Sequence, residues 1–183
     1  MNFLIISGNP KKDGLCYSLT EALSNGASSA GANVQILSTT TFERCQVCDE
    51  GWGICRSEHK CAFNHDDFND TLNVIRDADG ICFVSPVYWG EISESLKSFL
   101  DKLRRCQFGQ NGILSGKPTL LAASPGGSGN GMVSCLSQLD NFCRHTNASI
   151  FDYIGVNRKN REYKLHTAYE AARTLVLSTI AEK

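Results

Sequence analysis

Short apolar runs alternate with stretches of helical periodicity along the whole chain. The apolar runs predict five β-strands, at residues 2–7, 33–37, 80–85, 118–124 and 149–154. Apolar residues spaced three and four apart predict helices at residues 16–30, 67–78, 91–106, 131–145 and from about 163 onward. Such alternation with short connections is typical of a parallel sheet covered by helices on both faces. One long interruption stands out, a polar, cysteine-rich connection at residues 38–66.

The composition of the strands predicts their order in the sheet. The first, third and fourth strands are continuous apolar runs, as expected for strands buried on both faces. The second and fifth carry polar interruptions, such as Gln35 and Asp152, which suit the edges of a sheet. The expected architecture is a three-layer α/β/α sandwich with a five-stranded parallel sheet in the order 2-1-3-4-5. No linker or internal repeat divides the chain, so residues 1–183 are expected to form one domain.

Composition and charge narrow the range of partners. The chain is 42% hydrophobic and 20% charged, with a formal net charge of −1 and no long block of either sign. This balance gives no electrostatic reason to expect a nucleic acid or an anionic membrane as the main partner. The N-terminal apolar run is short and ends at Gly8, unlike a signal peptide, so a cytoplasmic protein is expected.

In an open α/β sheet, ligands bind beyond the carboxyl ends of the strands, where the strand order reverses. The first loop at that edge, residues 7–18, leads into a helix whose N-terminus favours anions. Gly8 and Gly14 allow main-chain N–H groups to turn inward. The loop also contains polar side chains suited to a phosphate: Asn9, Lys11, Lys12 and Ser18. A phosphate site and a solvated turn are both consistent with this pattern.

The second loop, residues 85–93, places two adjacent aromatic residues at the end of a buried strand. Pro86 fixes the direction of the chain, and Gly90 permits a close approach to the backbone. Tyr88 and Trp89 could offer a flat apolar surface to a ligand or pack into the core.

The third loop, residues 124–131, has four glycines within six residues. Glycines leave main-chain N–H and C=O groups unobstructed for a heterocycle or a phosphate, although a merely flexible loop has the same composition. Its position after a predicted central strand favours binding.

Together, the loops resemble those of the flavodoxin-like NAD(P)H-dependent FMN reductases, which include the iron–sulfur flavoproteins. The most specific match is the run at residues 85–103, and the resemblance extends over nearly the whole chain. It implies a flavodoxin-like fold, FMN as the cofactor and NAD(P)H as the electron donor to a small acceptor such as a quinone or free flavin. An alternative within the same resemblance is an electron-transfer flavoprotein, with or without a [4Fe–4S] cluster, that does not turn over NAD(P)H.

The resemblance also implies which residues hold FMN. The phosphate is expected at Asn9, Lys11, Gly14, Cys16 and Ser18. The isoalloxazine ring is expected against Pro86, Val87, Tyr88, Trp89 and Gly90, with its far edge near Gly126 and Gly127. No obligate catalytic side chain is expected, because the flavin carries the chemistry. Family members commonly form homodimers or homotetramers, and Trp52 and Phe108 are possible contact residues.

The first loop departs from the family at two positions. Leu15 and Cys16 stand where the family usually has Asn and Thr, which removes two side-chain donors to phosphate. A lost donor to a charged group weakens binding by about 1–3 kcal/mol, so reduced FMN affinity is expected. Cys16 at a helix N-terminus could be a reactive thiol, but an inert, packed thiol is the favoured interpretation.

The long connection contains four of the nine cysteines, in the pattern Cys45-x₂-Cys48-x₆-Cys55-x₅-Cys61. Four thiols in this spacing could bind a [4Fe–4S] cluster or zinc, with His59 and His65 as alternative zinc ligands. They could equally remain thiols without a metal. The iron–sulfur flavoproteins have a more compact motif here, so the sequence leaves all three possibilities open.

Overall fold

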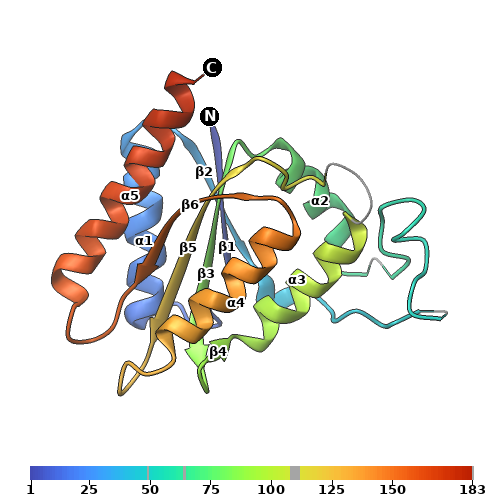
Figure 1. Cartoon of the computed structure of the whole chain (residues 1–183), viewed down its shortest axis with the longest axis horizontal. Coiled ribbons are helices and arrows are strands. Elements are labelled where there is room, and N and C mark those ends of the chain that lie inside the picture. Colours follow the sequence, from blue (N-terminus) through green and yellow to red (C-terminus); the bar gives the residue numbers. More distant parts are fainter. Residues whose placement is uncertain (49, 64, 108–111, 183) are drawn as a thin grey trace.

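The computed structural model describes residues 1–48, 50–63, 65–107 and 112–182. Its sheet has the order β2-β1-β3-β5-β6, and neighbouring strands along this path are parallel (Figure 1). The strands are β1 (Asn2–Ser7), β2 (Asn33–Ser38), β3 (Gly80–Tyr88), β5 (Pro118–Pro125) and β6 (Ser149–Gly155). This order confirms the flavodoxin-like sheet predicted from the strand compositions.

A short sixth strand, β4 (Glu91–Ile92), pairs antiparallel with the end of β3. The sequence pattern placed these residues at the start of a helix, and that prediction is wrong. The helix begins at Glu94 instead, because Ser93 is the N-cap and its hydroxyl accepts a hydrogen bond from the N–H of Leu96 at 3.4 Å. Strand β3 is also three residues longer than predicted and carries Pro86 to Tyr88.

Helices cover both faces of the sheet, as Figure 1 shows. Helices α1 (Gly14–Ser29) and α5 (Arg161–Ala181) pack against each other on one face. The opposite face carries α2 (Phe68–Asp77), α3 (Glu94–Cys106) and α4 (Met132–His145). A single turn of 3₁₀-helix, Thr39–Thr41, follows β2.

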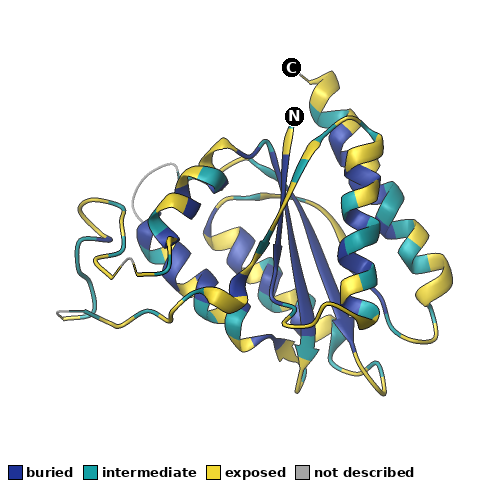
Figure 2. Ribbon diagram, turned by 180° about the vertical axis from the view of Figure 1, so that it is seen from behind, coloured by how far each residue is buried: buried dark blue, intermediate teal, exposed yellow. Residues whose placement is uncertain are grey.

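The alternation of side chains along the central strands builds two cores, one on each face. In β1, Phe3 and Ile5 join the core beneath α1 and α5, whereas Leu4 and Ile6 join the core beneath α2, α3 and α4. The central strands are buried along most of their length and the outer strands are exposed (Figure 2). The predicted central and edge positions are therefore confirmed.

The cysteine-rich connection lies outside the three layers and flanks α3 (Figure 1). One buried ion pair attaches it, between Asp66 and Lys102 of α3, at 2.9 Å and with side chains only 4% and 3% exposed. The Asp66 carboxylate also accepts hydrogen bonds from the N–H groups of Glu43 and Phe68, at 2.7 and 3.3 Å. Asp66 therefore joins both ends of the connection to one helix.

Candidate functional site

The first loop is seated firmly on the carboxyl edge of the sheet. The N–H of Gly8 donates to the carbonyl of Val84 in β3 at 2.9 Å. A Cβ on Gly8 would lie 2.7 Å from the Cβ of Leu96 and closer still to the Ser93 hydroxyl. Only glycine allows β1 to end this close to the start of α3, so Gly8 fixes the position of the loop that follows.

Two of the polar side chains of the first loop form hydrogen bonds to main-chain groups of the same segment. Asn9 donates through Nδ2 to the carbonyl of Lys11 at 2.8 Å and accepts from the Lys11 N–H at 3.3 Å. The Ser18 hydroxyl donates to the carbonyl of Gly14 at 3.1 Å. Asp13 precedes α1 but forms no side-chain cap, which leaves the first N–H groups of the helix for an anion.

Cys16 belongs to the core rather than to the loop surface. Its side chain is 8% exposed and packs in the core beneath α1 and α5. Burial, and then negative charge on Cys135, raise the pKa of the Cys16 thiol to about 12. The structure thus favours the inert thiol over a reactive one, and the main-chain N–H is what Cys16 can offer a phosphate.

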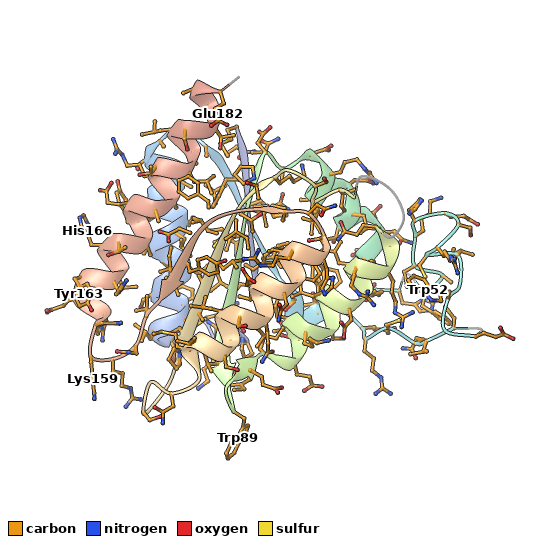
Figure 3. The ribbon with its side chains drawn as sticks, viewed as in Figure 1. Trp52, Trp89, Lys159, Tyr163, His166 and Glu182 are labelled. Atoms are coloured by element: carbon orange, nitrogen blue, oxygen red, sulfur yellow. The ribbon has the colours of Figure 1, made fainter. Side chains whose placement is uncertain are left out.

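The second loop forms the tip of a β-hairpin between β3 and β4. Trp89 and Gly90 occupy the two turn positions with φ of +54° and +85°, as in a type I′ turn. Trp89 is 104% exposed, and Figure 3 shows its side chain pointing away from the body of the molecule. Tyr88 is 46% exposed, so the interpretation of these aromatics as core residues is wrong.

A cavity of about 540 Å³ lies between this hairpin and the glycine-rich third loop. It is lined by five of the residues predicted to contact the flavin ring, namely Val87, Trp89, Gly90, Gly126 and Gly127. A Cβ built on Gly126 or on Gly127 meets no atom within 4 Å, so this loop opens onto free space. The volume falls within the roughly 300–1,000 Å³ usual for ligand pockets.

The structure does not bring the other predicted ring contacts into this cavity. Pro86 is buried within β3, in register with Ser124 of β5. Tyr88 lines a second cavity of about 820 Å³, which lies between the hairpin, α3 and the start of the cysteine-rich connection. Trp89 at the tip of the hairpin borders both cavities. The proposed phosphate residues line neither cavity and lie in the adjacent first loop.

Hydrogen bonds that the sequence did not reveal support the hairpin. The Ile92 N–H donates to the side-chain oxygen of Gln138 in α4 at 3.4 Å. The Ser93 N–H donates to the Ser85 hydroxyl at 2.9 Å. A serine just before a helical pattern is a capping signal that could have identified Ser93, whereas nothing local marks Gln138.

The four cysteines of the connection border one small cavity of about 20 Å³. A fifth cysteine, Cys106 at the end of α3, borders it as well, together with Lys102 and Arg105. Sequence spacing could not identify Cys106, because 44 residues separate it from Cys61 and only the tertiary fold brings them together. Neither His59 nor His65, the alternative zinc ligands, borders this cavity.

The shape of this cavity tests whether an iron–sulfur cluster fits. Among the described residues, no three His, Cys, Asp or Glu side chains are placed to hold a metal ion. A space of about 20 Å³ holds little more than one water molecule. The thiol chemistry suits a thiophilic metal, but the cavity as it stands does not fit a four-iron cluster.

Comparison with known proteins defines the family. Residues 1–160 match the model of the NADPH-dependent FMN reductases. The chain belongs to this family. It is 30% identical over 147 residues to an iron–sulfur flavoprotein of Methanocaldococcus jannaschii, covering 78% of this chain and 71% of that protein. It is 31% identical over 131 residues to an iron–sulfur flavoprotein of Methanosarcina thermophila, covering 69% of this chain and 63% of that protein.

Solved structures support the fold. An NAD(P)H:quinone oxidoreductase from Methanothermobacter marburgensis superimposes with a TM-score of 0.70 at 18% identity, covering 96% of each chain. An archaeal flavodoxin superimposes with a TM-score of 0.67 at 14% identity, covering 98% of this chain and 99% of that one. No helix in the described part of the chain is long and apolar enough to span a membrane. Phe108, one of the predicted subunit contacts, lies outside the described residues.

Proposed function

We propose that this chain is an FMN-binding oxidoreductase that takes electrons from NAD(P)H and delivers them to a small acceptor, such as a quinone or free flavin. Membership of the NADPH-dependent FMN reductase family supports the proposal. The observation that carries it is the cavity of about 540 Å³ between the Trp89 hairpin and the glycine-rich loop. That cavity lies at the carboxyl edge of β3 and β5, where ligands of open α/β sheets bind.

The residues present fit the two ends of FMN. The flat ring would lie in the cavity beside Val87, Trp89 and Gly90, with Gly126 and Gly127 along its edge. The phosphate would lie at the N-terminus of α1, near Lys11 and the N–H groups of Gly14 and Cys16. Bound FMN would supply the hydride and electron chemistry, while the chain binds and orients it.

Two side chains have further roles in this arrangement. Trp89 would lie at the rim of the ring site, because it borders both cavities at the tip of the hairpin. Asn9 would hold the phosphate loop in shape through its two bonds to Lys11, rather than donate to the phosphate itself. The larger cavity beyond Trp89 offers space for NAD(P)H or for the acceptor.

Tryptophan fluorescence can test FMN binding at this place. In a Trp52→Phe variant, Trp89 is the only remaining indole, and we expect added FMN to quench it to saturation. In the matched Trp89→Phe variant, the remaining Trp52 lies in the connection beside α3, so FMN should quench it far less (Figure 3). Equal quenching in the two variants would contradict the proposed site.

Anaerobic spectroscopy and turnover then test the reaction. We expect the absorption bands of bound FMN to bleach on addition of NADH or NADPH. With a quinone present, NAD(P)H oxidation should exceed the rate given by free FMN alone. A rate no greater than that of free FMN would reject the enzyme assignment.

A second candidate is an electron-transfer flavoprotein that does not turn over NAD(P)H. It is supported by the similarity of this chain to iron–sulfur flavoproteins. It predicts bound flavin that a reducing protein reduces but NAD(P)H does not. The same anaerobic experiment therefore distinguishes the two candidates.

We also propose that the chain forms a homodimer or homotetramer, as the family resemblance implies. The fully exposed Trp89 at the edge of the flavin cavity supports an interface there. Light scattering after size-exclusion chromatography tests this, and a monomer at all concentrations would contradict it.

A further inference from the structure

The cavity of about 820 Å³ follows one face of α3. This helix runs from the hairpin towards the cysteine-rich connection (Figure 1). Residues three and four apart on the helix line the cavity, beginning with Glu94 and ending with Arg104 and Arg105. The helical rise separates these two ends by about 15 Å. The cavity is therefore long enough for an extended ligand.

The end of the cavity at the hairpin is aromatic and acidic. Tyr88 and Trp89 border it and expose their rings. Glu91 lies opposite Tyr88 in the hairpin, and Glu94 begins α3 beside it. Neither glutamate forms an ion pair within the described part of the chain. This end suits an uncharged aromatic ring and repels an anionic group.

The opposite end of the cavity is basic. Arg104 and Arg105 border it from α3, and Arg44 lines the cavity from the connection. None of these three arginines is in an ion pair among the residues that the structure describes. Arg105 donates to the carbonyl of Gly51, and its guanidinium lies 5.1 Å from the centre of the Trp52 ring. Both partners are uncharged, so three positive charges remain for an anionic group.

The middle of the cavity carries no net charge. Lys97 and Asp101 line it and form an ion pair with each other. Ser98 lines the same stretch, and its hydroxyl is buried without a hydrogen-bond partner in the described residues. Buried hydroxyls in folded proteins usually have a partner, and a polar atom of a ligand would supply one here.

We propose that this cavity binds an electron acceptor that has an uncharged aromatic ring at one end and an anionic group roughly 10–15 Å away. The ring lies beside Tyr88 and Trp89, next to the hairpin that also borders the cavity proposed for FMN. The anionic group lies at Arg44, Arg104 and Arg105. This inference rests on the proposed function, because it names the chemical class of the acceptor.

The same charge pattern disfavours a nicotinamide dinucleotide as the occupant. With its nicotinamide at the hairpin, the diphosphate would lie between Glu94 and the Lys97–Asp101 pair, where no net positive charge offsets it. An acceptor with a single charge at its far end avoids this repulsion. The acceptor is therefore the occupant that the charges of the cavity favour.

Equilibrium dialysis with a matched pair of quinones tests the site in FMN-loaded protein. One probe is a 1,4-naphthoquinone with a carboxylate at the end of a six-carbon chain, and the other is its uncharged amide. We expect the carboxylate to bind about 10-fold more tightly at low ionic strength, and added salt to reduce the difference. Arg104→Gln should weaken binding of the carboxylate about threefold, and the Arg44→Gln/Arg104→Gln variant about 10-fold. Binding of the amide should change by less than about twofold.

Steady-state turnover then tests that the occupant is the acceptor. The hydride of NAD(P)H and one proton from solvent reduce the quinone to the hydroquinone, a transfer of two electrons. Arg104→Gln should raise the KM for the carboxylate about threefold with kcat unchanged. The KM for the amide and the KM for NAD(P)H should stay close to their wild-type values.

Two control variants test whether the position of the charge matters. Arg173→Gln removes an exposed arginine from α5, on the other face of the sheet, so binding of both quinones should match wild type. Glu94→Gln removes a carboxylate from the hairpin end of the cavity, so the anionic quinone should bind at least as tightly as in wild type. Circular dichroism shows whether each variant keeps the fold.

Three results would overturn the inference. The first is equal binding of the two quinones by wild-type protein, and the second is an equal loss in Arg173→Gln and Arg104→Gln. The third is an Arg104→Gln variant in which only the KM for NADPH rises, which would assign the arginines to the donor. FMN titration of the same samples separates the two proposals. Protein that binds FMN but does not distinguish the quinones rejects this inference alone, whereas protein that binds no FMN rejects the proposed function.

Discussion

Gly131 of the third loop lies against Gly90 at the tip of the β3–β4 hairpin. A Cβ on Gly131 would come 3.0 Å from the Gly90 nitrogen and closer still to its Cα. Gly131 also has a φ of +79°, which L-residues with side chains rarely adopt. This contact between two glycines sets the separation of the two loops that form the proposed flavin cavity.

Gly131→Ala should therefore lower stability and FMN binding more than a glycine-to-alanine change that only strains the backbone. We expect a loss of about 2–4 kcal/mol in stability, from left-handed strain and overlap with Gly90 together, and weaker FMN binding. The control is Gly116→Ala, at φ +73° with no atom within 4 Å of the added Cβ. Denaturation midpoints should fall more in Gly131→Ala than in Gly116→Ala, and only the former should lose FMN affinity. Equal effects would show that the close contact is unimportant.

Trp89 occupies a backbone conformation that suits asparagine or glycine much better than tryptophan. Trp89→Asn should relieve strain at φ +54° and raise the free energy of unfolding by about 1 kcal/mol. The same change removes the aromatic side chain at the rim of the cavity and should weaken FMN binding by roughly 1 kcal/mol, or about fivefold. Trp89→Phe, which keeps both the strain and a ring, is the control. If Trp89→Asn bound FMN as tightly as wild type, Trp89 would have no role at the flavin.

The Asp66–Lys102 pair should dominate the attachment of the cysteine-rich connection. Asp66→Asn leaves a buried ammonium unpaired, so we expect a loss of about 3–5 kcal/mol at neutral pH, partly recovered in the Asp66→Asn/Lys102→Met double variant. Asp101→Asn, which disrupts the exposed pair of the same helix with Lys97, should cost less than about 1 kcal/mol. Chemical denaturation of the four proteins measures both losses, and similar costs for the two pairs would refute the assigned role.

The same pair predicts a pH dependence. Burial alone would raise the pKa of Asp66, but Lys102 and the N–H groups of Glu43 and Phe68 outweigh it and lower that pKa. Because the folded-state pKa is depressed, this stabilisation is present above the unfolded value of about 3.9 and is lost as pH falls below it. The acid decline in unfolding free energy should be shallower in Asp66→Asn than in wild type.

Cys16 should resist alkylation although it lies at a helix N-terminus. With a pKa of about 12, roughly one Cys16 thiol in ten thousand is ionised at pH 8. Iodoacetamide at pH 8 should label Cys45 and Cys48, which are half-buried, well before Cys16. Peptide mapping by mass spectrometry measures the order, and early labelling of Cys16 in folded protein would contradict its burial.

The strand order and the outline of the site follow from the local pattern of the sequence. Continuous apolar runs such as residues 81–84 can be buried only between two helical layers, which placed the central strands correctly. Glycine-rich and aromatic loops after those strands then had to meet at one edge, because all the long strands are parallel. The family resemblance of residues 85–103 rests on the same local pattern and agrees with the family match.

The surroundings of individual side chains, in contrast, depend on contacts between distant parts of the chain. Successive side chains after Pro86 point to opposite faces of β3, so Val87 lines one cavity and Tyr88 lines the other. The sequence had suggested that both contact the same face of the flavin ring. Cys16 lies in the core, although its loop reads as a phosphate site, because helix periodicity turns it inward. Cys106 lies beside the cysteines of the connection because the buried ion pair of Lys102, one turn earlier on α3, holds the connection against this helix. Cys106 is too distant from these cysteines in sequence for their spacing to reveal the contact.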